Sequence, residues 1–142
     1  MSTIDNKAIL EQALENFNRP ASREAYFDLY HPSCTLHGSA GVGPDLEGIK
    51  QFYAGIWTAF PDAMVVAHDW VIAGDKVVVR FTFKGTHQGE LMGIPPTGKA
   101  FAVSGLTILR FANGQCVERW SQTDFLGILR QVGAIPTPEQ GH

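Results

Sequence analysis

The spacing of apolar residues changes along the chain from a helical repeat to a strand repeat. Apolar residues from Leu10 to Phe17 recur every three or four positions, which predicts a first helix that ends before Pro20. A shorter helix is expected over residues 23–30, followed by a brief strand over residues 34–38. The chain is therefore predicted to begin with helices.

The clearest helical pattern lies between Asp45 and Pro61. Asp45 is expected to cap this helix, because its carboxylate accepts a hydrogen bond from a free amide of the first turn. We interpret the glycine-rich segment 38–44 before it as a flexible connection, with a lid over a cavity as the alternative. The apolar stripe of the helix consists of Ile49, Phe52, Tyr53, Ile56, Trp57 and Phe60.

Beyond Pro61 the period becomes two, which is typical of strands that are buried on one face. Strands are expected over residues 64–72 and 76–84, and over residues 101–111 and 115–122, with each pair forming a hairpin. Asn113-Gly114 favours a tight turn in the second hairpin. One parity of residues 76–84 is wholly apolar and is predicted to face the helices: Val77, Val79, Phe81 and Phe83.

A long loop over residues 85–99 joins the hairpins, and a last helix is expected over residues 125–132, before Gly133. Helices that precede antiparallel hairpins pack on one face of the resulting sheet. The predicted fold is α+β, a cone-shaped barrel in which three N-terminal helices pack on a curved, mainly antiparallel sheet around one pocket. The domain is expected to cover residues 1–136, with a tail over residues 137–142.

Composition narrows the classes of partner. The chain has 142 residues, of which 44% are hydrophobic and 18% charged, and its net charge of −3 offers no basic surface to nucleic acid or an anionic membrane. No apolar run approaches the roughly 20 residues of a membrane span, and no signal-peptide pattern is present, so a cytoplasmic location is expected. Cys34 and Cys116 are expected to be buried free thiols. The scattered histidines and acidic residues suggest no metal site, and no cofactor is expected.

Two segments carry recognisable motifs. The first is residues 85–99, which read Gly-Thr-His-Gln-Gly-Glu-Leu-Met-Gly-Ile-Pro-Pro-Thr-Gly-Lys. The second lies within residues 110–133 and consists of Arg110-Phe111, Asn113-Gly114, Trp120, Asp124, Gly127, Gln131 and Gly133. With Leu36-His37-Gly38 and Phe60-Pro61-Asp62, these segments resemble the SnoaL-like polyketide cyclases, over roughly residues 30–136. The resemblance implies a nuclear transport factor 2-like fold, a small organic substrate, and catalysis without metal or cofactor.

The resemblance also implies an intramolecular aldol condensation, in which a carboxylate on the last strand and a histidine on the preceding strand move the proton. In this chain those two positions are occupied by Ser121 and Thr107. A serine hydroxyl is no base near neutral pH without a partner base. His87 and His37 are therefore the candidate acid/base groups, with hydrogen-bonded structural histidines as the alternative. Asp124 is better interpreted as the N-cap of the last helix than as an acid.

Strand parity and the helical stripe together predict the walls of the pocket and the outer surface of the sheet. Trp120 is expected to pack outside the pocket. Leu106 and Ile108 have the parity opposite to Thr107, so the outer sheet face should be apolar and covered in a homodimer or higher oligomer. The residues expected to line the pocket are Tyr53, Trp57, Phe81, His87, Thr107 and Ser121.

The leading hypothesis is a cofactor-independent cyclase or isomerase that acts by proton transfer on a small, apolar, carbonyl-bearing molecule similar to a polyketide. The first alternative is a non-catalytic binding protein for a small apolar organic ligand. A second alternative is a relative of epoxide hydrolases or hydroxylation proteins, which requires an acid placed over a water molecule.

Overall fold

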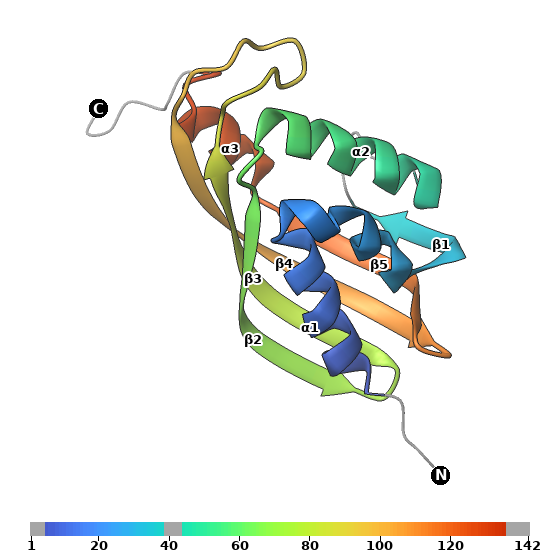
Figure 1. Ribbon diagram of the computed structural model, residues 1–142. Helices are drawn as coiled ribbons and strands as arrows, with labels where there is room; N and C mark the ends of the chain where they lie inside the picture. Colours follow the sequence, from blue (N-terminus) through green and yellow to red (C-terminus); the bar gives the residue numbers. More distant parts are fainter. Residues whose placement is uncertain (1–4, 39–43, 136–142) are drawn as a thin grey trace.

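The computed structural model describes residues 5–38 and 44–135, and it shows helices packed on one face of a curved five-stranded sheet (Figure 1). The strand order is β1-β5-β4-β3-β2, with β1 parallel to β5 and the other pairs antiparallel. The predicted α+β architecture is therefore confirmed. The elements are α1 (Asn6–Phe17), the 3-10 helix η1 (Pro20–Leu29), β1 (Tyr30–His37), α2 (Leu46–Ala59), β2 (Met64–Ala73), β3 (Lys76–Thr86), β4 (Ala100–Ala112), β5 (Gln115–Thr123) and α3 (Phe125–Gln131).

Two sequence expectations concern segments that lie wholly or mostly outside the described residues. The suggested lid over 38–44 has only its two ends, Gly38 and Pro44, in the described part, and the tail over 137–142 lies beyond it.

The two long helices begin at the aspartates that precede them. Asp45 Oδ1 accepts a hydrogen bond of 2.9 Å from the Gly48 amide, as predicted, and Asp5 caps α1 in the same way. The second helix differs from the prediction, because it is a 3-10 helix and ends at Leu29. Tyr30 already has extended backbone angles, so β1 starts there and contains Pro32. Proline lacks an amide for the ladder, and β1 accepts it as an edge strand with an irregular register around that residue.

Both hairpins form where the sequence predicts them. The φ angles of Asn113 and Gly114 are 52° and 82°, the left-handed conformation that a tight two-residue hairpin turn requires. The apolar parity of β3 faces the helices and is buried, with exposed fractions of 0% for Val77 and 7% for Phe83. Period-two alternation therefore identified the inner face of the sheet correctly.

The core between sheet and helices is rich in aromatic rings. Phe17 of α1 is 2% exposed and packs against Tyr26, Tyr53 and Trp57 with ring-centroid distances of 5.2–5.4 Å. Cys34 and Cys116 are free and buried, as expected, and burial raises the pKa of Cys116 to about 12. Among the helices of the described residues, none has the length and apolarity that crossing a membrane requires.

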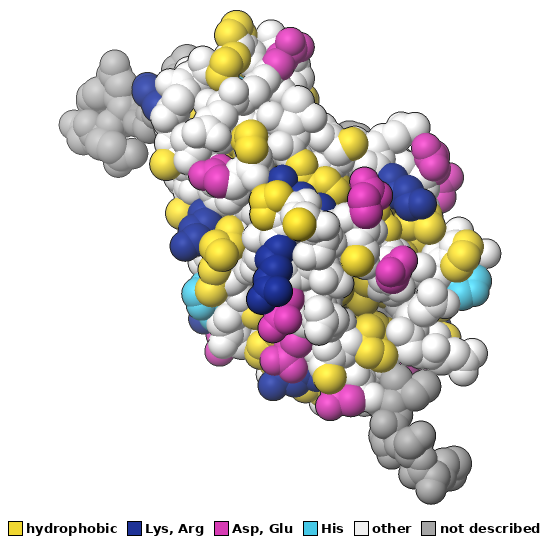
Figure 2. Space-filling model, viewed as in Figure 1, with side chains coloured by type: hydrophobic (Ala, Val, Ile, Leu, Met, Phe, Trp, Pro, Cys, Tyr) yellow, Lys and Arg dark blue, Asp and Glu magenta, His cyan; other side chains and the backbone are white. Residues whose placement is uncertain are grey.

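The outer face of the sheet carries one apolar row that crosses four strands. In the ladder, Val71 pairs with Val78, Val78 with Ile108, and Ile108 with Trp120. Val71 is 58% exposed, and Leu106, beside the row, is 50% exposed. By contrast, the helical side in Figure 2 shows apolar side chains interspersed with charged ones. We call Val71, Val78, Ile108 and Trp120 the outer apolar row.

We propose that a second copy of the chain covers the outer apolar row. Two ion pairs lie beside this row, Arg80 with Asp69 and Arg110 with Glu118. Because each pair presents a positive and a negative group, two copies related by a two-fold axis can place opposite charges against each other. We expect light scattering to find a dimer or a higher oligomer at micromolar concentration, and Ile108→Arg to produce a monomer. Gln51→Arg, on the exposed side of α2, is the matched control. A monomeric wild-type protein would contradict this proposal.

Candidate functional site

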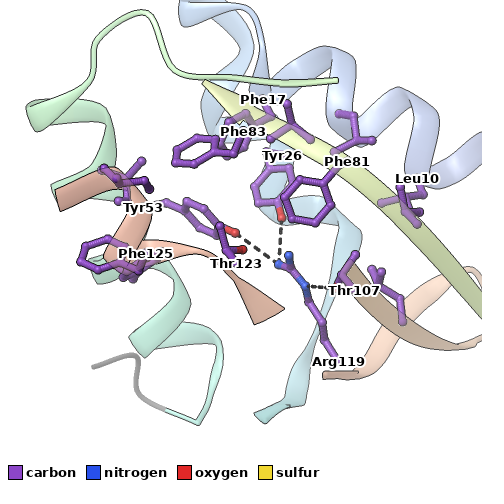
Figure 3. A pocket seen from close by; sticks show the side chains of 17 residues that line it. Leu10, Phe17, Tyr26, Tyr53, Phe81, Phe83, Thr107, Arg119, Thr123 and Phe125 are labelled. Atoms are coloured by element: carbon purple, nitrogen blue, oxygen red, sulfur yellow. Dashed lines mark hydrogen bonds between the residues drawn. The ribbon is translucent and has the colours of Figure 1, made fainter. Parts of the chain in front are cut away.

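A pocket opens between the helices and the inner face of the sheet (Figure 3). Its volume is about 90 Å³, several times the roughly 10–15 Å³ that one water molecule requires. Every helix and every strand of the described residues except β1 contributes at least one side chain to its lining. The lining residues are Leu10, Leu14, Phe17, Tyr26, Phe52, Tyr53, Ile56, Val65, Val79, Phe81, Phe83, Thr107, Leu109, Arg119, Thr123, Phe125 and Ile128.

The lining is mainly apolar, with few polar groups. The polar side chains among the lining residues are Tyr26, Tyr53, Thr107, Arg119 and Thr123, and none is a carboxylate or an imidazole. Apolar walls with a few converging polar groups are the usual design of a small-molecule site. The polar chemistry of this pocket therefore depends on one guanidinium and on hydroxyl groups.

Arg119 of β5 is the centre of this polar group, and all of its side-chain partners are neutral oxygens. Its Nε donates to Thr107 Oγ1 at 2.9 Å. Its Nη1 donates to the hydroxyl of Tyr30 at 2.6 Å and to those of Tyr26 and Tyr53 at 3.3 Å each. The three phenols come from η1, from the start of β1 and from α2, so three segments meet at one guanidinium. Figure 3 shows two of these phenols, Tyr26 and Tyr53, beside Arg119.

Electrostatics keep the guanidinium charged and the phenols neutral. Burial raises the pKa values of Tyr26 and Tyr30 well above the ordinary value of tyrosine, so both hydroxyls keep their protons at neutral pH. Burial by itself lowers the pKa of Arg119, but the surrounding tyrosine oxygens raise that pKa by more. No ion pair involves Arg119 within residues 5–38 and 44–135. The pocket thus holds a cation without an anionic partner from the protein.

The structure brings some of the expected lining residues into the pocket and leaves others outside it. Tyr53, Phe81 and Thr107 line the cavity. Ser121 is buried on the same face of the sheet but does not line the cavity, and its hydroxyl accepts from Nη2 of Arg119 at 3.4 Å. Trp57 does not line the pocket, because its ring packs in the core between Phe17 and Phe27 and against Arg23 of η1. Trp120 lies on the opposite face of the sheet.

His87 is completely buried but lies outside the pocket. His87 follows the last residue of β3, Thr86, and continues the inward parity of the strand, but it does not belong to the lining of the cavity. Its Nδ1 lies 3.2 Å from Thr97 Oγ1 and accepts from the Thr97 amide at 3.4 Å, and its ring packs against Phe60. The glycine–histidine motif thus stabilises the loop against the end of α2. This geometry does not support proton transfer between His87 and a molecule in the pocket.

His37 lies near the rim of the sheet, also outside the pocket. Its Nε2 is 2.8 Å from Oε2 of Glu118, and its ring stacks on Trp120 with a centroid distance of 5.2 Å. Hydrogen bonds from His37 and Arg110 lower the pKa of Glu118. This cluster therefore belongs to the outer face, where a catalytic imidazole would have no access to the cavity.

Asp124 caps α3, as its position in the sequence predicts. Its Oδ1 accepts a hydrogen bond of 2.8 Å from the Gly127 amide. Asp124→Asn should change the free energy of unfolding by only a few tenths of a kcal/mol, whereas Asp124→Ala should lower it by about 1 kcal/mol, since asparagine also caps helices. Denaturant unfolding of both variants measures this. Activity lost in Asp124→Asn at unchanged stability would instead identify Asp124 as a catalytic acid.

Sequence reasoning missed Arg119, Tyr26 and Tyr30. The available signal was strand parity, because Arg119 shares the inward parity of Ser121 on β5. An arginine on the inner parity is unexpected in a buried strand face, since a buried charge usually needs a partner. Such a violation of the pattern is itself an indication of a functional position.

Comparisons with known proteins agree with this architecture. Residues 8–132 match the family model of the SnoaL-like polyketide cyclases. Aklanonic acid methyl ester cyclase DnrD of Streptomyces peucetius is 29% identical over 107 residues, which cover 72% of this chain and 74% of that protein. The crystal structure of AclR from Streptomyces galilaeus has a TM-score of 0.83 at 25% identity, covering 98% of this chain and 87% of AclR. TsrD from Streptomyces laurentii has a TM-score of 0.77 at 29% identity, covering 94% of this chain and all of TsrD. The chain belongs to the SnoaL-like polyketide cyclase family.

Proposed function

We propose that the chain cyclises or isomerises a small, mainly apolar carbonyl compound by stabilising negative charge on a substrate oxygen in this pocket. The observation that supports this proposal is the Arg119 guanidinium, held by neutral hydroxyls at the wall of an apolar cavity. Fixed hydrogen-bond donors in a water-poor site stabilise a developing oxyanion much more strongly than water does.

The reaction that the site can perform depends on which protons its side chains can donate or accept. In a cyclisation, a carbon next to a carbonyl loses a proton, and the resulting enolate attacks a second carbonyl. Arg119 and the Tyr53 hydroxyl can hold the enolate oxygen, while a phenol proton can pass to the new alkoxide and be replaced from water. The lining offers no carboxylate or imidazole as a base, so the substrate needs an acidic proton that water or hydroxide removes. A 1,3-dicarbonyl compound meets this condition.

Aklanonic acid methyl ester, the compound named in the 29% identical relative, is a suitable first test compound. We expect the wild-type protein to convert it, or a related aromatic polyketide ester, to a cyclised isomer faster than buffer alone does. Chromatography of timed reactions measures the conversion. The matched variants are Tyr53→Phe, which removes one hydroxyl at the guanidinium, and Phe52→Tyr, which adds a hydroxyl at the neighbouring lining residue.

The absence of a base among the lining residues also favours a second candidate function, a non-catalytic carrier or sensor of the same ligand class. The two functions differ in one measurement. Micromolar binding without turnover supports the binding protein, and turnover above background supports the cyclase. Neither binding nor turnover for a series of aromatic polyketide esters would contradict both functions.

A further inference from the structure

The hydrogen-bond partners of the Arg119 guanidinium are unevenly distributed, because three hydroxyls lie at Nη1 and only one lies at Nη2. A guanidinium carries five N–H groups, of which Nη2 carries two. Nη2 has one partner, Ser121 Oγ at 3.4 Å, so at least one of its hydrogens is available to another molecule. Because Arg119 lines the cavity, a ligand in the pocket can accept this hydrogen bond.

The phenols around Arg119 add donors to the same place. Tyr26 and Tyr30 are joined by a hydrogen bond of 2.6 Å between their hydroxyls, so one donates to the other, and the second retains a free hydrogen. The Tyr53 oxygen accepts from Arg119, and its own hydrogen has no acceptor among residues 5–38 and 44–135. A ligand that reaches this part of the wall therefore meets hydrogen-bond donors, and its matching atoms must be acceptors.

The charges around the pocket, like its hydrogen-bond donors, favour a ligand with negatively charged oxygens. The Arg119 guanidinium is buried and charged, and its partners are neutral oxygens, so an anionic ligand beside it would form a charge-assisted hydrogen bond that the protein itself does not provide. Glu118, the carboxylate next to Arg119 in sequence, faces the other side of the sheet and is bound to His37 and Arg110. The protein thus supplies the cation, the hydrogen-bond donors and the apolar walls of the pocket, and a ligand can supply the anion.

We propose that the pocket binds its ligand as a planar organic anion, either an aromatic carboxylate or the enolate of a 1,3-dicarbonyl, with the charged oxygens against Arg119 and the Tyr53 hydroxyl. This inference rests on the proposed function only in taking the pocket as the ligand site. It goes further by specifying the charge of the ligand. In both anions one negative charge is shared by two oxygens, so one oxygen can accept from the guanidinium and the other from the Tyr53 hydroxyl.

Isothermal titration of the wild-type protein with two matched pairs of probes tests this inference. The first pair is 2-naphthoate and its neutral amide, 2-naphthamide. The second is 2-acetyl-1,3-indandione, which ionises, and its 2-methyl derivative, which cannot. We expect the anion of at least one pair to bind roughly 10- to 100-fold more tightly than its neutral partner, as hydrogen bonds to charged groups imply. The pair that shows the preference identifies the type of anion.

A substitution behind the guanidinium provides a second test. Ser121→Asp places a carboxylate beside Nη2 of Arg119, where it supplies the missing anion within the protein. We expect this variant to bind naphthoate at least tenfold more weakly than wild type and to bind naphthamide about equally. Ser121→Asn has the same shape without the charge and should retain the preference for naphthoate.

The outcomes separate this inference from the function on which it rests. Equal affinities within both pairs, or full naphthoate affinity in Ser121→Asp, would overturn the anion inference and leave the pocket as a ligand site. Failure of all four probes to bind at millimolar concentration would overturn the pocket as the ligand site, and the inference with it.

Discussion

Arg119→Met is expected to lower kcat/KM for cyclisation of a polyketide ester by roughly 10²–10³-fold, the usual effect of removing one donor that stabilises an oxyanion. Methionine fills much of the same volume and removes the only charged side chain among the lining residues. The loss should come mainly from kcat, because the enolate carries more charge on oxygen than the carbonyl does.

Stability distinguishes this effect from simple damage to the fold. The variant removes the hydrogen bonds of Arg119 to buried hydroxyls, so its free energy of unfolding should fall by about 1–3 kcal/mol, which leaves the protein folded at the assay temperature. The matched control is Arg110→Met on β4, whose guanidinium pairs with Glu118 outside the pocket and whose loss should leave kcat/KM unchanged. Retained activity in Arg119→Met, or activity lost only in proportion to unfolding, would refute the role of Arg119.

Gly89→Ala is expected to lower the free energy of unfolding by about 3 kcal/mol, and Tm by roughly 10 °C for a chain of this size. A Cβ atom at Gly89 would lie 2.0 Å from the backbone oxygen of Thr58 at the end of α2. The amides of Gln88 and Gly89 both donate to Ala59 O, at 2.9 and 3.0 Å, so the loop has no room to withdraw without losing these bonds.

Gly55→Ala provides the matched control for this substitution. Gly55 lies within α2, and a Cβ atom there would contact nothing within 4 Å. Alanine at that position should raise the free energy of unfolding by about 0.5–1 kcal/mol, because glycine is a poor helix former. Thermal unfolding of both variants by circular dichroism measures the contrast. An unchanged Tm in Gly89→Ala would show that the loop does not pack closely on α2 in solution.

The family motifs and the chemistry of the pocket turn out to lie in different places. The motif segment over residues 85–99 holds the loop on the end of α2, through Gly89 and the buried His87. The pocket chemistry depends instead on Arg119 and on phenols that no quoted motif contains. Belonging to the family therefore establishes the architecture, whereas the side chains of the pocket decide which reaction is possible.

Local periodicity in the sequence was sufficient for the secondary structure and for the inner face of the sheet. The period of two placed Val79, Phe81 and Thr107 on the pocket side, because alternation follows directly from the pleat of a strand. The same period placed His87 on the inner side, where it is buried, but its ring packs against Phe60 outside the lining of the cavity. Periodicity placed the end of the second helix one residue too late, because Tyr30 is already the first residue of β1 and pairs with Cys116 of β5.

Only the tertiary structure decided the chemistry of the pocket. Arg119 meets Tyr30 across 89 residues of chain and Tyr53 across 66, and no local pattern encodes such meetings. The sequence by itself determined where the strands and helices form and which side of the sheet is apolar, because these depend on neighbouring residues. The packing of η1 and α2 over β5 then placed three hydroxyls around one buried guanidinium, because side chains that are distant in sequence meet only when the helices close over the sheet.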